Sequence, residues 1–368
     1  MGLLRFYLAL CVLLFHIGGT GPVPLLSALP VVSAGTAVYC FFILSGFYIT
    51  LGLNERYSTA DTNRVFYASR VIRLWPVYLL SLVLVAWSGA LTQTFRVALD
   101  LPWIMAAIAI FSNVTIFGLD ILTHISAIDG KIVFSEYGSD AKHNGANFIL
   151  NLPAWSLASE LVFYLVAPFV VRSFKRSLIF LAIGVVYMVV AGRIANAYAI
   201  PLNVVGYFPC YMMFFGVGMT AYWLNRKFPA TMRWPLVVGY AGVGAAAYLV
   251  LRPDQFPVGY LCLALAVPLL FALTKRNKVD AFLGDLAYPM YILHVPVGMV
   301  LRSTLGEVSP VMYFSAAMIV SVLALLLVDA PIERLKYRWL EKRDVRVTRD
   351  EEAAQRAAAD SRAADSEQ

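Results

Sequence analysis

Charged residues are scarce in this chain of 368 residues, at 14%, whereas hydrophobic residues make up 60%. Soluble globular domains usually carry about 25% charged residues. The apolar stretches are too many and too long to be buried in soluble cores, so the composition excludes an ordinary soluble enzyme and a disordered scaffold. We therefore expect one polytopic membrane domain.

Cysteine and histidine are also scarce, with four residues of each type. The cysteines each lie inside an apolar run and form no C-x-x-C pair, which indicates packing residues: Cys11, Cys40, Cys210 and Cys262. His124 and His143 share one polar stretch, but nothing supplies further ligands at a zinc-like spacing. We expect solvated loop histidines there, and no metal site.

The net charge of +7 does not indicate a nucleic-acid partner. The cations form short clusters between apolar stretches, and no basic face with interleaved aromatic residues emerges. Basic connections that flank membrane spans explain this pattern better.

Eleven stretches are apolar enough to be candidate membrane spans, for which about 20 residues are needed. They are residues 3–18, 34–53, 74–92, 101–119, 148–171, 177–192, 204–224, 234–251, 256–273, 284–301 and 311–328.

The placement of the basic clusters decides how many of these candidates cross. Cations gather at 56–73, 172–176, 226–233, 275–278 and 334–343. All five clusters fall on the cytoplasmic side only if one candidate between residues 73 and 148 fails to cross. The weakest candidate is 101–119, which holds Pro102, Ser112, Asn113 and Thr115. We predict an all-α integral membrane bundle of about ten transmembrane helices plus this partial or re-entrant segment, with both termini cytoplasmic and residues 120–147 external.

The two ends of the chain need separate interpretation. Arg5, the apolar stretch after it and Val32-Ser33-Ala34 resemble a signal peptide with its cleavage site. The polar spacing within that stretch and the spans that follow favour an uncleaved first span. After Val345 the composition shifts to Ala, Arg, Asp and Glu, so we expect a transmembrane domain over residues 1–343 and a charged, disordered cytoplasmic tail over 344–368.

Ionisable residues within spans are costly and are candidates for function by default. Arg5 and His16 are eleven residues apart, which is about three helical turns and about 16 Å of rise. They therefore project from nearly the same face, one near each membrane surface. An anchoring arginine with an interfacial histidine would give the same pattern.

Three further groups stand out by spacing. Ser156, Glu160 and Tyr164 follow one another at four-residue intervals and so line one helical face, with Glu160 several residues inside the span. Arg70 and Arg73 place two guanidiniums on one side of a helix, an arrangement that suits phosphate groups or a cytoplasmic anchor.

The third group is Tyr288-x-x-Tyr291-x-x-His294, which sets two phenols and an imidazole along an arc of about 120° on one helix. Aromatic residues alone would indicate packing or an interfacial belt. A histidine near the middle of the membrane beside them favours a polar cavity.

Together these residues resemble the acyltransferase family 3 of integral-membrane O-acyltransferases, over nearly all of the chain before the tail. The resemblance rests on five motifs in order: Arg5-x10-His16, Phe41-Phe-Ile-Leu-Ser-Gly-Phe47, Arg70-x-x-Arg73, Trp155-Ser-Leu-x-x-Glu160 and Tyr288-x-x-Tyr291-x-x-His294.

The resemblance implies transfer of an acyl group, most often acetyl, from cytoplasmic acyl-CoA to a hydroxyl of an extracytoplasmic or lipid-linked carbohydrate, such as lipopolysaccharide or another surface polysaccharide. It implies a bacterial inner membrane, acyl-CoA as co-substrate and no permanently bound cofactor. By this analogy the Arg-x10-His pair, the Arg-x-x-Arg pair and Glu160 are essential.

We assign roles accordingly. Neutral His16 is suited to act as the base near pH 7, with Glu160 orienting its ring. Arg5, Arg70 and Arg73 are expected to bind the phosphates of acyl-CoA. Substrate contacts are expected from Ser45, Trp155, Ser156, Tyr288, Tyr291 and His294.

Two questions stay open at this point. Direct transfer and a transient acyl-His16 fit the residues equally well. A secondary transporter or flippase for a glycan or lipid could use the same polar cavity without covalent chemistry, whereas a structural scaffold would leave Glu160 and both span histidines unexplained.

Overall fold

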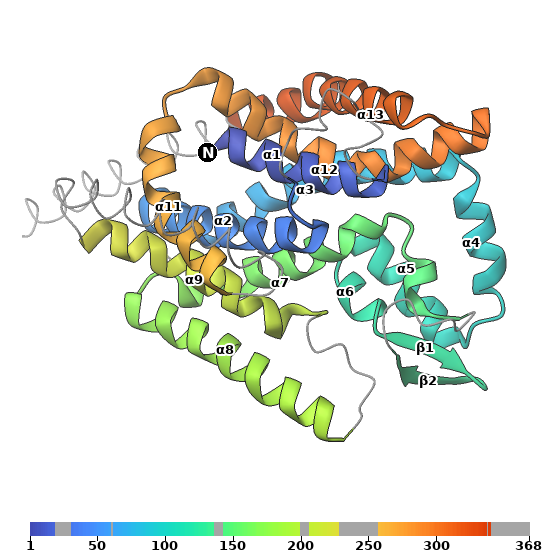
Figure 1. The fold of residues 1–368 in the computed structure, drawn as a ribbon, viewed down its shortest axis with the longest axis horizontal. Coiled ribbons are helices and arrows are strands. Elements are labelled where there is room, and N and C mark those ends of the chain that lie inside the picture. The colour runs from blue at the N-terminus through green and yellow to red at the C-terminus, as the bar shows by residue number, and fades with distance from the viewer. Residues whose placement is uncertain are drawn as a thin grey trace, which may run out of the picture.

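The computed structural model describes residues 1–18, 31–59, 62–135, 143–198, 206–227, 257–336 and 338–339. Helices dominate these residues and pack side by side in a bundle (Figure 1). The predicted span at 234–251 and the predicted tail at 344–368 lie outside the described residues.

The first part of the chain contains several of the helices that surround the site. It also contains a small capping region, by which we mean the described residues between 120 and 147. Its elements are α1 (Gly2–His16), α2 (Ala34–Glu55), α3 (Asn63–Trp87), α4 (Ala90–Ala98), α5 (Trp103–Thr115), α6 (Leu119–Leu122), β1 (Ile125–Ile128), β2 (Lys131–Phe134) and the 3-10 turn η2 (Gly145–Phe148).

The remaining elements complete the bundle. They are the 3-10 turn η3 (Leu152–Ala154), α7 (Trp155–Val170), α8 (Phe174–Ala197), α9 (Phe208–Lys227), α11 (Pro257–Thr274), α12 (Lys278–Leu305), α13 (Pro310–Ala324) and the π-helical turn η5 (Leu325–Asp329).

Five described helices are long and apolar enough to cross a membrane: Ala34–Glu55, Asn63–Trp87, Leu152–Val170, Phe174–Ile194 and Pro310–Lys336. Helix α5 has 13 residues, about 20 Å of rise, which is less than the roughly 30 Å of a hydrocarbon core. It agrees with the partial segment predicted at 101–119. The structure thus shows a helical protein with several candidate spans, and ten crossings stay a prediction.

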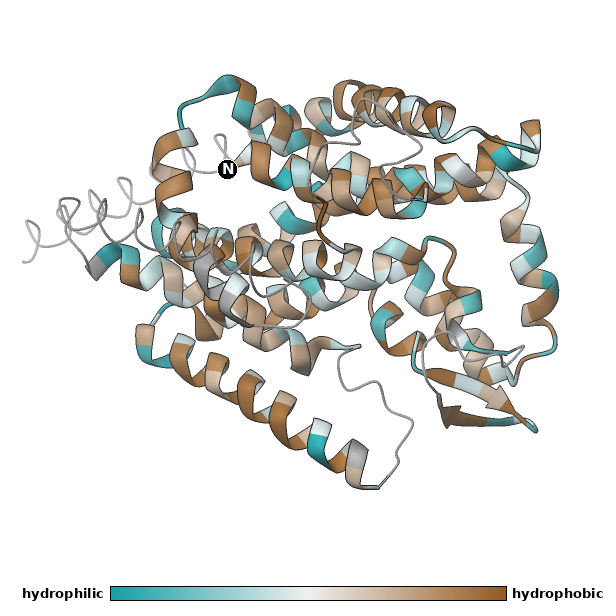
Figure 2. Ribbon diagram, viewed as in Figure 1, coloured by the Kyte–Doolittle hydropathy of each residue, from teal (hydrophilic) through white to brown (hydrophobic). Residues whose placement is uncertain are grey.

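Apolar side chains face outward on the peripheral helices. Figure 2 shows that α8 and α13 consist mainly of hydrophobic residues, and the exposed fractions of Val186 on α8 and Leu327 after α13 are 58% and 71%. Water would make such surfaces unfavourable, whereas lipid would not.

Helix α3 begins at Asn63, whereas the hydropathy pattern predicted a span from residue 74. The difference arises because Arg64, Arg70 and Arg73 lower the hydropathy of the first turns. Arginine is nevertheless a good helix former, so the helix continues through them. Arg70 and Arg73 therefore lie on a continuous helix, as their three-residue spacing predicted, and only the predicted start of the span is corrected.

Helix α12 packs against α1, α3 and α13, so it organises the region around the site. At its N-terminal end the backbone of Gly284 approaches that of Gly2, and a Cβ added to Gly284 would lie 2.9 Å from the Gly2 Cα. Two glycines at this crossing therefore let α1 and α12 approach closely.

Residues 120–147 form more than the loop that the sequence predicted. Strands β1 and β2 pair antiparallel, with Ile125 opposite Phe134. Their turn uses Asp129 and Gly130, both with positive φ, as a two-residue hairpin requires. This hairpin is a correction to the predicted all-α fold.

The expectation of a solvated His124 was wrong. His124 is 4% exposed, and its Nδ1 contacts Thr123 Oγ1 at 2.6 Å and the Asp120 carbonyl at 3.1 Å. Asp120 itself is buried and accepts a hydrogen bond from Ser159 Oγ at 2.9 Å. Burial raises the pKa of Asp120, although this hydrogen bond lowers it in part. The capping region is thus fixed to α7 by buried polar contacts.

Candidate active site

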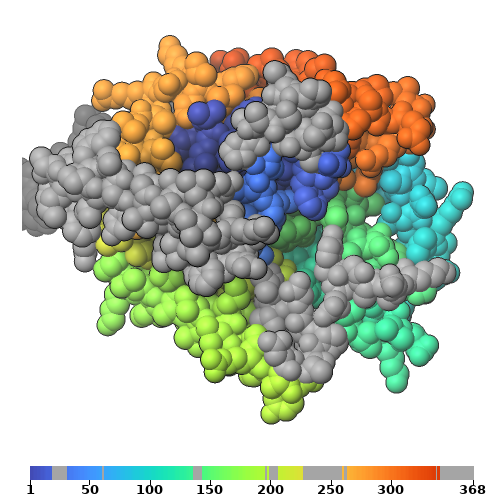
Figure 3. Space-filling view, viewed as in Figure 1, coloured from blue at the N-terminus to red at the C-terminus, as the bar shows by residue number. Residues whose placement is uncertain are grey.

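A cavity of about 510 Å³ lies between α1, α2, α3, α7, α11 and α12. One end is lined by Met1, Gly2, Thr274, Lys275 and Asp280, where α1 and α12 begin and α11 ends. The first residues of α1 lie in a recess beside α11 and α12 on the surface seen in Figure 3. The other end lies deeper along the helices and is lined by Val38, Phe41, Ser156, Leu157 and Tyr291. We call these two ends the mouth and the inner end.

Three guanidiniums line this cavity, those of Arg5, Arg70 and Arg73. Arg5 lies over the ring of Tyr48 at 6.0 Å, and Arg70 lies 5.8 Å from the Tyr164 ring. Within the part of the chain that the structure describes, none of the three has a hydrogen bond or an ion pair within 4 Å. The nitrogen Nε of Arg70 is buried without such a partner. Buried cations without bonded acceptors favour an anionic ligand.

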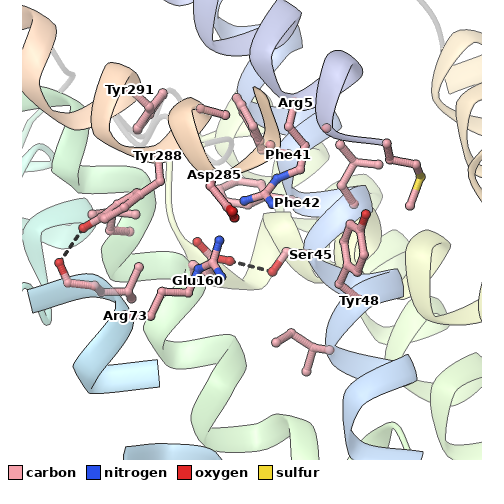
Figure 4. Close-up of a pocket in the computed structure, with 18 of the residues that line it drawn as sticks. Arg5, Phe41, Phe42, Ser45, Tyr48, Arg73, Glu160, Asp285, Tyr288 and Tyr291 are labelled. Atoms are coloured by element: carbon pink, nitrogen blue, oxygen red, sulfur yellow. Dashed lines mark hydrogen bonds between the residues drawn. The ribbon is translucent and has the colours of Figure 1, made fainter. Parts of the chain in front are cut away.

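Carboxylates near these arginines balance part of the charge without binding it directly. Arg73 interacts electrostatically with Glu333, Asp285 and Asp329. Figure 4 shows Arg5, Asp285 and Glu160 directed into the same space. The cavity is therefore polar along one wall, with its cationic groups still able to bind an anion.

Glu160 is held by two hydroxyl groups. Its Oε1 accepts hydrogen bonds from Ser45 Oγ and from Tyr164 OH, each at 2.6 Å (Figure 4). The four-residue spacing on α7 correctly predicted that Ser156, Glu160 and Tyr164 share a face, since all three line the cavity. Glu160 is thus a fixed part of the cavity wall.

The proposed hydrogen bond between Glu160 and His16 is not formed in the described structure. Among the described residues, the Glu160 carboxylate bonds to α2 and to its own helix, whereas His16 lies at the far end of α1 and contacts α12. The spacing of Arg5 and His16 along one helix explains this, because it separates the histidine from the level of Glu160.

The partner of His16 is His294. Their rings have centroids 4.8 Å apart, and His294 Nε2 lies 3.2 Å from His16 Nδ1. His294 is fully buried, and His16 is partly exposed. The two residues are 278 positions apart, and the packing of α1 on α12 brings them together.

The backbone around this pair indicates which ring nitrogens carry protons. His16 Nδ1 lies 2.8 Å from the Val12 carbonyl, and His294 Nδ1 lies 3.1 Å from the Met290 carbonyl. A nitrogen that faces a carbonyl oxygen must donate, so both neutral rings are protonated at Nδ1. His294 Nε2 then accepts from His16, and His16 Nε2 keeps its lone pair. Among the described residues, His16 Nε2 has no hydrogen-bond partner, which suits a base.

Tyrosines of α12 fix the wall between the cavity and the histidines. Tyr288 OH donates to the Leu74 carbonyl at 2.6 Å, and Tyr291 OH contacts Ser156 Oγ at 2.8 Å. Tyr291 also lies 6.4 Å from His294, measured between ring centroids. Trp155, expected to contact substrate, does not line the cavity, and its ring packs 5.8 Å from Tyr211.

At the mouth, Asp280 fixes the beginning of α1. Its carboxylate accepts hydrogen bonds from the backbone N–H groups of Gly2 at 2.7 Å and Leu3 at 2.9 Å. Burial raises the pKa of Asp280, but these bonds and one from the N-terminal ammonium outweigh burial and hold the pKa at about 2. The carboxylate therefore stays ionised and satisfies the first N–H groups of the helix.

Tyr48 and Lys275 are two of the cavity residues that were not anticipated from the sequence. Tyr48 lies three positions after Ser45 on α2, and this helical spacing would have indicated a shared face. Lys275 lines the mouth, although it was counted only as part of a basic connection. The described residues contain no group of three or more His, Cys, Asp or Glu side chains that could hold a metal ion.

The geometry defines a cavity with a cationic wall, a carboxylate held by two hydroxyl groups, and a pair of histidines beyond its inner end. The family model described as an acyltransferase domain, that of acyltransferase family 3, matches residues 1–329. The chain belongs to this family, as the five motifs indicated, and it is an acyltransferase. No curated protein and no solved structure is significantly similar to it.

Proposed function

We propose that this protein is a membrane-embedded O-acyltransferase that moves an acyl group, most often acetyl, from acyl-CoA to a hydroxyl of an extracytoplasmic or lipid-linked carbohydrate. One observation supports this most strongly. Three arginines with no hydrogen bond or ion pair to a described residue line a cavity, and Tyr291 at its inner end lies about one helical turn before His294, the residue that contacts His16.

The donor binds at the mouth and along the arginine wall. Coenzyme A carries several phosphates, and guanidinium groups bind phosphate through paired N–H donors. Arg5, Arg70 and Arg73 supply such donors from two rigid helices, with Lys275 at the mouth. The acyl end of the donor would then extend towards the inner end.

The acceptor hydroxyl is activated by His16. Nε2 of His16 takes the proton of the hydroxyl, and the oxygen attacks the thioester carbonyl carbon. The C–S bond then breaks, the thiolate of CoA leaves, and it recovers the proton from the imidazolium. Transfer through acyl-His16 uses the same atoms, with the ring nitrogen attacking first and the hydroxyl taking the acyl group second.

Glu160 has a different role from the one its motif suggested. It holds the Ser45 and Tyr164 hydroxyls beside the arginines, so we assign it to the donor wall. His294 takes over the orientation of the His16 ring through its Nε2 acceptor.

The setting that we propose is a bacterial plasma membrane, with both termini cytoplasmic and the capping region outside. The outward apolar faces of α8 and α13 and the family support a membrane location. Lipopolysaccharide or another surface polysaccharide is the acceptor class. Family membership favours this enzyme over a transporter or flippase, which would not consume acyl-CoA.

The donor site can be tested by binding of CoA to the purified protein, without knowing the acceptor. Arg73→Ala and Arg70→Ala should each raise the Kd for CoA about tenfold or more, since a hydrogen bond to a charged group contributes roughly 1.5–3 kcal/mol. Arg73→Lys should recover affinity only in part, because it lacks the planar fork.

Arg64→Ala is the matched control, because Arg64 is an exposed arginine on the same helix that does not line the cavity. It should bind CoA as the wild type does. Wild-type affinity in both Arg70→Ala and Arg73→Ala would contradict the assignment of this cavity to the donor.

A further inference from the structure

Two aromatic side chains, Phe41 and Tyr291, form a wall that lines the inner end of the cavity. The rings of Phe41 and Tyr291 meet edge to face, with centroids 5.8 Å apart, and both line the cavity. Tyr291 is held in place because its hydroxyl contacts Ser156 Oγ at 2.8 Å and the Pro153 carbonyl at 3.2 Å. The wall is therefore fixed on the side of α12.

The histidine pair lies on the other side of this wall. Neither His16 nor His294 lines the cavity, whereas Tyr291 contributes to it and lies one turn before His294 on α12. From Asp280 at the mouth to Tyr291, α12 rises about 16 Å, and His294 adds about 4.5 Å. A group that enters from the mouth thus meets Phe41 and Tyr291 before the histidines.

We propose that this wall sets the length of the acyl group to that of acetyl, and that Phe41 is the residue that determines it. The proposal rests on the proposed function, in which the thioester carbonyl must come close to the hydroxyl activated by His16. The acyl carbons beyond that carbonyl then have to fit beside Phe41 and Tyr291. Each added methylene would meet an aromatic ring.

Phe41 is the residue of this wall that can be shortened without breaking a hydrogen bond. Phe42, the next residue, also contributes to the cavity lining, but it is 3% exposed and its ring packs in the core against Phe215, 4.7 Å away between centroids. Phe41 is only half-buried and turns to the cavity (Figure 4). Shortening Phe41 opens the inner end without breaking a hydrogen bond, whereas removing Tyr291 would break the bonds of its hydroxyl to Ser156 Oγ and to the Pro153 carbonyl.

The test compares the Kd values of CoA, acetyl-CoA, butanoyl-CoA and hexanoyl-CoA for purified wild-type protein and for Phe41→Ala and Phe41→Leu. The wild type should favour acetyl-CoA over hexanoyl-CoA. Phe41→Ala should shift this ratio about tenfold or more towards hexanoyl-CoA, because discrimination by an apolar pocket spans about 10- to 200-fold per methylene. Phe41→Leu should give a smaller shift in the same direction.

Phe271→Ala provides the matched control. Phe271 lines the same cavity near the mouth, where its ring lies 6.0 Å from that of Tyr48. The same change in volume there should leave the ratio of acetyl-CoA to hexanoyl-CoA at the wild-type value.

The outcomes separate this proposal from the proposed function. If Phe41→Ala and Phe41→Leu bind CoA normally but keep the wild-type ratio, Phe41 does not select the acyl length. A Phe271→Ala variant with the same shift as Phe41→Ala would also overturn the proposal. If the wild type binds neither CoA nor any of the three acyl-CoA thioesters, the assignment of this cavity to the donor is wrong, and the proposed function fails with it.

Discussion

At the scale of single residues, the histidine pair decides which group is the base. Both rings present Nδ1 to a backbone carbonyl, so the carbonyls of Val12 and Met290 select the tautomers. His294 Nε2 is occupied by His16, whereas His16 Nε2 is free among the described residues. The two rings therefore differ at Nε2 and not in their backbone surroundings, because only the Nε2 of His294 faces the other ring.

His16→Gln should nearly abolish acylation, because an amide keeps hydrogen bonding but cannot take a proton at neutral pH. A positioned base contributes about 10²- to 10⁴-fold. His294→Gln should retain part of the activity, since its amide oxygen can still accept from His16 Nδ1. Mass spectrometry of surface carbohydrates from cells that express each variant measures the acyl content.

His143→Gln is the control for this series, because that histidine lies in the capping region away from both rings. All three variants should bind CoA with wild-type affinity. A His16→Gln protein that acylates normally would remove His16 as the base.

At the scale of elements, two prolines interrupt the hydrogen bonding of α12, and one of the freed carbonyls is bound by another segment. Pro296 has no N–H, so the Ile292 carbonyl loses its partner within the helix. Asn151 Nδ2, just before η3, donates to that carbonyl at 2.9 Å and to Ser81 Oγ at 2.9 Å. One buried amide thus links α3, α12 and the start of α7 next to Tyr291 and His294.

The structure predicts that the effects of Asn151→Leu and Pro296→Ala are not additive. Asn151→Leu alone should destabilise the protein by about 1–3 kcal/mol, because the Ile292 carbonyl is left buried without a donor. In a Pro296→Ala background the new N–H can bond to that carbonyl, so the loss should be smaller. Thermal unfolding of the detergent-purified variants, as a double-mutant cycle, measures the coupling.

Pro268→Ala on α11 serves as the reference background, since Asn151 makes no hydrogen bond with α11 among the described residues. In this background Asn151→Leu should lower the stability of the protein as much as it does in the wild type. Equal losses of stability in the wild type, Pro296→Ala and Pro268→Ala backgrounds would show that Asn151 does not replace the N–H donor that Pro296 lacks.

At the scale of the whole molecule, the described helices place the two polar regions at opposite ends of the bundle. The mouth is formed where α11 ends and α12 begins, next to the basic stretch Lys275–Lys278. The capping region with β1 and β2 lies beyond α5 and α6, away from the mouth (Figure 1). This arrangement agrees with the charge placement that assigned basic clusters to the cytoplasm.

Cysteine labelling tests that orientation. In a variant without the four native cysteines, Lys131→Cys in the hairpin should react with an impermeant maleimide in intact cells, because both its strand and its side chain are exposed. Arg276→Cys, also exposed but near the mouth, should react only after permeabilisation. The reverse pattern would invert the topology and place the donor site outside the cell.

Much of the site could be predicted from the sequence, because helical periodicity is local. The spacing of Arg5 and His16, of Arg70 and Arg73, and of Ser156 and Glu160 depends only on 3.6 residues per turn. In the structure the three arginines and the α7 residues face one cavity, whereas His16 does not line it. Eight of the eleven proposed site residues line the cavity: Arg5, Ser45, Arg70, Arg73, Ser156, Glu160, Tyr288 and Tyr291.

The sequence by itself determined the helical class, the apolar character and the family, since each depends on composition and on the order of short motifs. Only the tertiary structure decided which side chains contact one another in the site. Glu160 pairs with Ser45 and Tyr164 rather than with His16, and His16 meets His294 across 278 positions. Such pairs depend on which helix faces pack together and at what level, which no local spacing specifies. The hairpin and the burial of His124 were missed for the same reason, because contacts with α7 and with the residues just before α9 exclude water from a stretch that is polar in sequence.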